Sequence, residues 1–175
     1  MGNILNRNKR HNSKSIKSKN TINVDTLDLF SLNPDEIPLV PNKGLITKAR
    51  VCSIYDGDTI TCIFIHKFKD IGIPIKLNIR ILGVDCPEIK SNNPIESNAA
   101  ELVRDHLARM IFEKDVDIII EKWDKYGGRA LANVYYNNIN ISQYLIENNM
   151  GKQYNGNKKT TWTNDELNKI TYISQ

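Results

Sequence analysis

The chain has 175 residues and a mass of 20.0 kDa, the size of one ordinary domain with an extension. A composition of 40% hydrophobic and 25% charged residues excludes a wholly disordered chain. The sequence has no apolar run long enough for a transmembrane helix, and its beginning lacks the apolar stretch of a secretory signal peptide. Its three cysteines lack CxxC spacing, so we expect reduced thiols in an intracellular protein.

The net charge of +4 is unevenly distributed along the chain. Residues 1–20 hold six Lys and Arg residues and no acid, so the remainder holds 18 bases against all 20 acids. The remainder is therefore close to neutral, and the overall charge is a poor argument for nucleic-acid binding. We expect a disordered basic tail over residues 1–20, a linker or packed arm over residues 21–44, and one folded domain over residues 45–175.

The basic tail is compatible with three interpretations. Met1 and Gly2 followed by basic residues are typical of N-terminal acylation with a polybasic membrane anchor, although Asn6 stands where Ser or Thr is usual. The same bases suit an arm that contacts nucleic acid or another polyanion, or a nuclear address. Membrane or polyanion contact through the tail therefore stays an open expectation.

Alternating apolar residues predict five strands, and helical periodicity predicts three helices. We expect the strands, in chain order, at residues 46–55, 59–66, within 71–84, 115–123 and 129–136. We expect the helices at residues 97–112, 139–150 and 164–173, the first capped by Ser97 or Asn98. Residues 66–74 would be a long linker, and Pro87 and Pro94 would keep residues 85–94 out of a helix. This order predicts an α+β fold whose five-stranded antiparallel sheet closes into a small barrel.

Three loops between these elements carry acids and arginines. Asp56-Gly57-Asp58-Thr59 places two carboxylates around a glycine, which suits a cation, but Asp-Gly is also the commonest hairpin turn. RILGVDCPE, residues 80–88, ends a strand in two acids, as an ordinary solvated strand end also can. DKYGGRALA, residues 124–132, is a polar hairpin whose arginine would by default be solvated. Each loop alone is a weak signal.

Taken together, four strings resemble, in order and spacing, the signature of the staphylococcal nuclease (thermonuclease-like) family: IYDGDTI, RILGVDCPE, DKYGGRALA and MGKQYNG. The likeness spans roughly residues 46–162. It implies a five-stranded OB-type barrel with three helices, in agreement with the element order. It also implies a Ca²⁺-dependent nuclease that hydrolyses the phosphodiester bonds of DNA, with RNA as an alternative substrate, and with little sequence specificity. We expect it to act as a monomer.

The resemblance assigns metal ligands. Asp58 and Asp85 are expected to bind Ca²⁺ through their carboxylates, because this cation takes oxygen ligands in irregular geometry. The backbone carbonyl of Cys86 is expected to be a further ligand, at a position where the family usually has threonine. Asp56 would lie near the metal without binding it directly and would help to position these ligands.

The resemblance also assigns residues that act on the substrate. Glu88 would orient or deprotonate the attacking water, and Arg80 and Arg129 would hold the scissile phosphate. Lys152 and Tyr154 would form the edge of the substrate pocket. One departure concerns Arg129, because many members read DKYGR where this chain reads DKYGGR, and the extra glycine can displace the arginine.

Two simpler interpretations accompany this assignment. Some barrels of the family have lost their acids and arginines and only bind nucleic acids or proteins, whereas this chain keeps the full set. Lys158 and Lys159, further along the chain, would either steer phosphate or be solvated.

Overall fold

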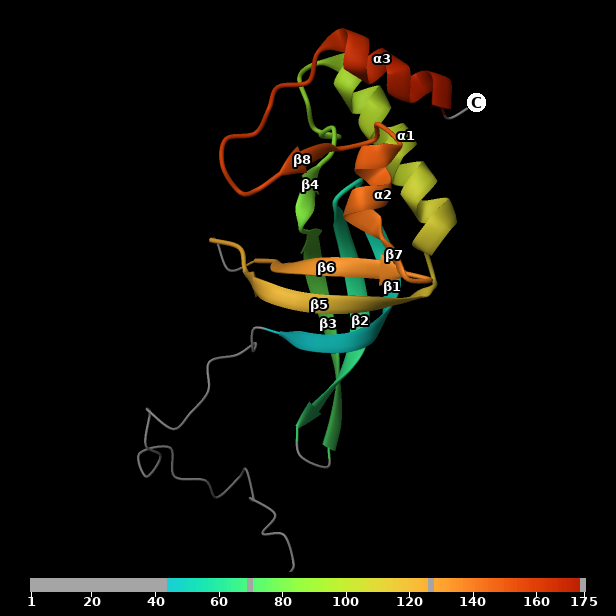
Figure 1. The fold of residues 1–175 in the computed structure, drawn as a ribbon. Helices are drawn as coiled ribbons and strands as arrows, with labels where there is room; N and C mark the ends of the chain where they lie inside the picture. The colour runs from blue at the N-terminus through green and yellow to red at the C-terminus, as the bar shows by residue number, and fades with distance from the viewer. Residues whose placement is uncertain (1–43, 69–70, 126–127, 174–175) are drawn as a thin grey trace, which may run out of the picture. The chain divides into compact units, whose positions relative to one another are not determined.

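The computed structural model describes residues 44–68, 71–125 and 128–173 (Figure 1). The expected basic tail and nearly all of the expected linker lie outside these ranges. The elements are β1 (Leu45–Asp56), β2 (Thr59–Phe68), β3 (Ile71–Ile81), β4 (Gly83–Asp85), α1 (Pro94–Ile111), β5 (Asp115–Trp123), β6 (Ala130–Tyr136), β7 (Ile139–Asn140), α2 (Ile141–Glu147), β8 (Lys152–Tyr154) and α3 (Asn164–Ile173). Within the described ranges, no helix is long and apolar enough to cross a membrane.

Five strands form a closed barrel in the order β3-β2-β1-β5-β6, with β3 pairing to β6. Consecutive neighbours in this order are antiparallel, but the closing pair is parallel, with Arg80 of β3 opposite Leu131 of β6. The predicted five-stranded barrel is therefore confirmed, and its sheet is antiparallel except at the closing pair. A ring of five strands is odd-numbered, so direction cannot alternate all the way round. The parallel closure lays the start of β6 beside the end of β3.

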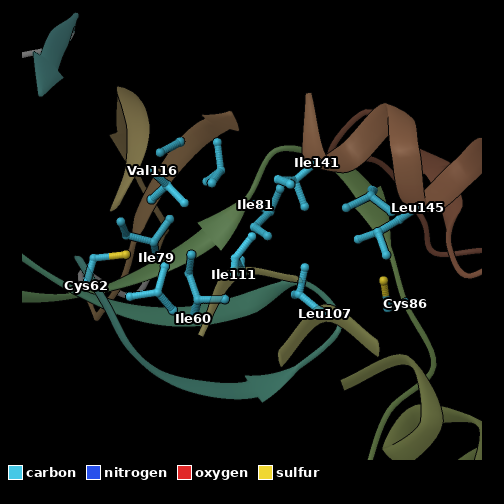
Figure 2. Close-up of a cluster of buried hydrophobic side chains, with 14 of the residues drawn as sticks. Ile60, Cys62, Ile79, Ile81, Cys86, Leu107, Ile111, Val116, Ile141 and Leu145 are labelled. Carbon is cyan, nitrogen blue, oxygen red and sulfur yellow. The ribbon is translucent and has the colours of Figure 1, made fainter. Parts of the chain in front are cut away.

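The barrel core is filled by alternate residues of the strands, as period-two patterning requires (Figure 2). In β5, for example, Val116, Ile118 and Ile120 are buried. Leu107 and Ile111 of α1 close one end of this core. The three predicted helices are all present and gather at that end, while the paired ends of β2 and β3 project from the other (Figure 1).

The first helix begins three residues earlier than the sequence pattern indicates. Asn93 is the N-cap, and its side-chain oxygen accepts a hydrogen bond of 3.0 Å from the Ile95 amide. Pro94, expected to exclude a helix, occupies the first turn, where the missing N–H costs nothing. Ser97, one of the two expected caps, instead donates to the Ile89 carbonyl at 2.8 Å. The loop that precedes α1 is thereby fastened to the helix.

Other boundaries also differ from expectation. Residues 66–74, expected as a linker, mostly continue β2 and β3 as a ribbon, with Lys67 opposite Gly72. The second helix spans only Ile141–Glu147, because Asn140 caps it and the left-handed Asn149 (φ 58°) follows it. The third helix starts at Asn164, as predicted. A small second sheet pairs β4 with β8 and places Asp85 opposite Lys152.

Candidate active site

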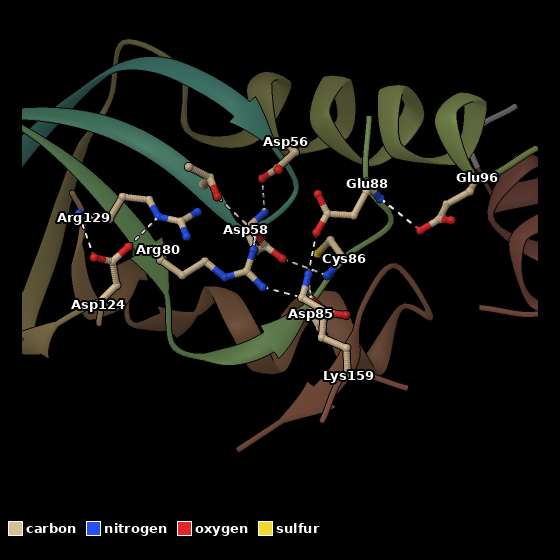
Figure 3. A network of polar contacts seen from close by, with 11 residues as sticks. Asp56, Asp58, Arg80, Asp85, Cys86, Glu88, Glu96, Asp124, Arg129 and Lys159 are labelled. Atoms are coloured by element: carbon tan, nitrogen blue, oxygen red, sulfur yellow. Dashed lines mark hydrogen bonds and ion pairs between the residues drawn. The ribbon is translucent and has the colours of Figure 1, made fainter. Parts of the chain in front are cut away.

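Arg80 joins two buried carboxylates at the end of β3 (Figure 3). One terminal nitrogen, Nη1, is ion-paired with Asp58 Oδ1, and the other, Nη2, lies 2.9 Å from Asp85 Oδ1. Strand alternation points Arg80 away from the core that Ile79 and Ile81 fill. The three residues that the sequence placed on two separate loops are therefore in contact. The planar guanidinium group suits this geometry because it can serve two carboxylates at once.

Asp58 is the most buried of the acids, with 1% of its surface exposed. Its Oδ2 accepts a hydrogen bond of 2.8 Å from the Cys86 amide, and the Asp56 side chain accepts one of 3.2 Å from the Asp58 amide. Burial raises the pKa of Asp56, and the Coulombic attraction of Arg80 opposes this shift. The two aspartates thus share one tight turn, with Asp56 behind Asp58.

Gly57 is required between these aspartates because the turn is packed without spare room. A Cβ atom at Gly57 would lie 2.5 Å from Val103 Cγ1 and 2.7 Å from Cys86 Sγ. The Cys86 side chain is itself buried, and burial raises the pKa of its thiol. Its sulfur therefore packs between elements, while its backbone donates to Asp58.

Glu88 lies on the loop that follows β4, with 48% of its side chain exposed. Its amide donates to Glu96 Oε1 at 3.3 Å, and Ser91 Oγ donates to Glu96 Oε2 at 2.6 Å. Glu96 belongs to the first turn of α1. The loop is therefore attached to α1 through Glu96. The carboxylate of Glu88 lies at the surface, beside Asp85 and Lys159 (Figure 3).

Lys159, which the sequence left either to steer phosphate or to be solvated, instead contacts the acidic cluster. Its ammonium group lies 2.9 Å from Asp85 Oδ1 and forms an ion pair with Glu88 Oε1. Burial lowers the pKa of Lys159, but the hydrogen bonds and the Coulombic attraction of Glu88 and Asp85 together raise that pKa overall. The lysine comes from the segment between β8 and α3, 71 residues beyond Glu88. No local pattern in the sequence predicts this contact.

Arg129 precedes β6 and is held by Asp124 on the other side of the hairpin. Its Nε lies 3.1 Å from Asp124 Oδ2, and Asp124 Oδ1 accepts from the Gly128 amide at 2.9 Å. These hydrogen bonds lower the pKa of Asp124 although burial acts in the opposite direction. Figure 3 shows the terminal nitrogens of Arg129 turned away from Asp124, on the side where Arg80 lies. The extra glycine thus contributes its amide to the hairpin.

Lys152 and Tyr154 of β8 lie in different surroundings. Tyr154 lines a pocket of about 270 Å³ together with Arg80, Leu82 and Lys122. Lys152 is absent from that lining; its ammonium group lies 2.8 Å from Glu166 Oε2 and 4.5 Å from the centre of the Trp162 ring. Tyr154 therefore lies beside Arg80 in this pocket, whereas Lys152 is attached to α3.

The charges of this cluster do not balance. Asp56, Asp58, Asp85 and Glu88 supply four carboxylates, whereas Arg80 and Lys159 supply two cationic groups in contact with them. Buried carboxylates are costly unless they are paired or bind a cation. The donor set fits a hard divalent cation that takes oxygen ligands. Across the described residues, however, no three His, Cys, Asp or Glu side chains converge as a ready-made metal cluster, because Asp58 and Asp85 converge on Arg80.

The fold and this cluster define an OB-type barrel with a charged site at the helical end. The family model for staphylococcal nuclease homologues matches residues 78–172, which is more than half of the chain. The protein therefore belongs to the staphylococcal nuclease homologue family, a nuclease family. The matched range covers Arg80, Asp85, Glu88 and Arg129 but begins after Asp56 and Asp58. No curated protein matches the chain.

Proposed function

We propose that this protein is a Ca²⁺-dependent nuclease that hydrolyses phosphodiester bonds of DNA, and of RNA as a second substrate, with little sequence specificity. The observation that carries the proposal is the contact of Arg80 with both Asp58 and Asp85, with Glu88 at the rim of the same cluster. An anion clamp, a pair of buried carboxylates and a solvent-accessible carboxylate are the parts that hydrolysis of a phosphodiester needs.

The carboxylates of Asp58 and Asp85 and the backbone carbonyl of Cys86 would hold the Ca²⁺ ion. The excess of acids over bases in the cluster supports this assignment, since a divalent cation would neutralise it. When bound, the cation supplies Lewis-acid polarisation of a phosphoryl oxygen. Asp56 lies behind Asp58, receives the Asp58 amide and so fixes the turn that presents the ligand.

Glu88 would accept a proton from the attacking water. About half of its side chain is accessible, and its backbone is fixed to Glu96, so a water molecule can reach a carboxylate whose position is set. General-base catalysis of this kind contributes roughly 10²–10⁴-fold in rate. The 5′ oxygen would be the leaving atom, as the family resemblance implies.

Arg80 and Arg129 would bind the oxygens of the scissile phosphate. In support of this, β6 pairs in parallel with β3, with Ala130 opposite Ile79, so Arg129 lies next to the strand that carries Arg80. Planar guanidinium groups bind two phosphate oxygens at once, which an ammonium group cannot do. Tyr154, which lines the pocket beside Arg80, would form the edge of the substrate site, with Lys152 behind it.

The metal dependence is tested by digestion of plasmid DNA and of single-stranded RNA in millimolar Ca²⁺ and in excess EGTA. We expect cleavage only with Ca²⁺ and its loss in Asp85→Asn. Asp117→Asn is the matched control, because Asp117 is an acid on β5 that pairs with Lys48 on the surface. Cleavage that persists in EGTA, or a fully active Asp85→Asn protein, would contradict the proposal.

A further inference from the structure

Two cationic side chains meet on a single oxygen of Asp85. Arg80 Nη2 and Lys159 Nζ each lie 2.9 Å from Asp85 Oδ1. Arg80 continues to Asp58, while Lys159 continues to Glu88. The cluster is thus a chain of alternating charge that runs Asp58, Arg80, Asp85, Lys159, Glu88 (Figure 3). Lys159 links the proposed metal ligand to the proposed base.

The segment that carries Lys159 is held by hydrogen bonds to the residues that follow the lysine. Lys152 donates to the Thr161 carbonyl at 3.1 Å, and Glu166 accepts from the Thr163 amide at 2.8 Å. Residues 155–160 are exposed, and 45% of the Lys159 side chain is accessible. The lysine side chain can therefore leave the two carboxylates without disturbing the core, because its contacts are at the surface. The hydrogen bonds that hold the segment involve Thr161 and Thr163 and stay in place.

From this arrangement we infer that Lys159 is a built-in counter-ion of the metal site, which ties Asp85 to Glu88 in the metal-free protein and is displaced when the cation binds. The inference rests on the proposed function, since it takes Asp85 as a metal ligand. A divalent cation on Asp85 would repel both positive groups that contact Oδ1. Lys159 is the one that can withdraw, because 45% of its side chain is exposed, against 12% for Arg80, which Asp58 also holds. Lys159 therefore lowers the affinity for Ca²⁺, and its ammonium group stays ion-paired with the carboxylate of Glu88 until the metal ion binds.

Adjacent lysines provide a matched pair of variants. Lys158 is exposed, and no ion pair of Lys158 is found among the described residues, so Lys158→Met removes the same charge from the same segment without touching the cluster. Lys159→Met removes the charge from Asp85 and Glu88, and Lys159→Arg keeps it. Comparison of the three separates the specific contact from a general change in net charge.

The test is calorimetric titration of Ca²⁺ into wild type and the three variants at one ionic strength, without substrate. We expect Lys159→Met to bind Ca²⁺ about tenfold more tightly, since in wild type the ion must first displace Lys159 from Asp85 and Glu88, and the variant lacks this competing cation. Lys158→Met and Lys159→Arg should bind within about twofold of wild type.

Thermal unfolding of the same proteins gives a second readout. In EGTA, Lys159→Met should melt below Lys158→Met, because Asp85 and Glu88 lose a shared cation, and saturating Ca²⁺ should raise its melting temperature more than that of Lys158→Met. Equal Ca²⁺ affinity in Lys159→Met and Lys158→Met, or weaker binding in Lys159→Met, would overturn the inference and leave the metal site standing. Absence of Ca²⁺ binding in all four proteins would overturn the proposed metal site and the inference together.

Discussion

The backbone amide of Cys86 donates a hydrogen bond of 2.8 Å to the carboxylate of Asp58, across 28 residues of sequence. This bond joins the turn between β1 and β2 to the strand end that carries Asp85. Because the Asp58 carboxylate is buried, the amide also stabilises its charge where water cannot. The carboxylate of Asp58 is therefore positioned by the backbone of the residue that follows Asp85, and a change in either turn should affect both proposed ligands.

Gly57→Ala should destabilise the fold. The new Cβ atom would lie 2.5 Å from Val103 Cγ1 and 2.7 Å from Cys86 Sγ, and overpacking of this kind costs about 1–3 kcal/mol. Urea denaturation measures the effect. Gly128→Ala is the control, since a Cβ atom there meets nothing within 4 Å, and it should change the free energy of unfolding by less than about 0.5 kcal/mol. Equal effects of the two substitutions would show that the turn has room to adapt.

Arg80→Lys should lower kcat by roughly 10²-fold, the scale of losing one preorganised charged contact in a transition state. A lysine keeps the charge but has one nitrogen, so it cannot serve Asp58 and Asp85 together. Steady-state kinetics on a defined DNA duplex checks this, beside Arg104→Lys, whose arginine pairs with Asp105 on the exposed side of α1. Wild-type turnover in Arg80→Lys would remove the guanidinium from the mechanism.

Asp124→Asn should reduce activity by less than Arg129→Ala does. Asp124 shapes the hairpin by accepting from Arg129 Nε and from the Gly128 amide, but the arginine is the group proposed to meet phosphate. We expect a loss of about tenfold or less for Asp124→Asn and roughly 10²-fold for Arg129→Ala. Measured kcat/KM values decide, and a larger loss in Asp124→Asn would make the hairpin carboxylate the primary group.

His106 of α1, whose Nε2 lies 2.8 Å from the Tyr144 hydroxyl, should make stability depend on pH just below neutrality. Burial, and then the nearby Arg109, lower the pKa of His106 from its ordinary 6.5. The unfolded chain therefore takes up this proton first, so stability is complete above about pH 6.5 and is lost as the pH falls through the folded-state pKa. Melting temperatures at about pH 7.5 and pH 5.5 should differ more for wild type than for His106→Gln. An equal difference in both proteins would contradict the shift.

The closed barrel follows from the sequence, and so does its parallel closure once the strands are counted. Five strands with antiparallel neighbours can close only through one parallel pair, which is the pairing that sets Arg80 beside Leu131. The start of α1 differs from the prediction because proline, which is excluded from a helix interior, is favoured in the first turn, where Pro94 lies. This difference is local and leaves the architecture unchanged.

Some contacts of the site can be predicted from the sequence, and others cannot. Arg80, Asp85 and Glu88 follow one another on a strand and its loop, so their proximity can be predicted from period and spacing. The contact of Lys159 with the cluster cannot be predicted by these means, because its partner Glu88 lies 71 residues away and a lysine on a polar loop, such as the adjacent Lys158, is by default solvated. The contact depends on how the segment between β8 and α3 is folded back, which is decided by tertiary packing of α3 on α1.

The most direct test of the account is single-turnover cleavage of a DNA duplex in millimolar Ca²⁺ by Glu88→Gln, with DNA binding measured in parallel. Glu101→Gln, an exposed acid of α1, is the matched control. We predict that Glu88→Gln cleaves at least about 10²-fold more slowly while its affinity for DNA stays close to that of wild type, as expected for loss of a general base. Cleavage by Glu88→Gln at the rate of Glu101→Gln would contradict the proposed mechanism.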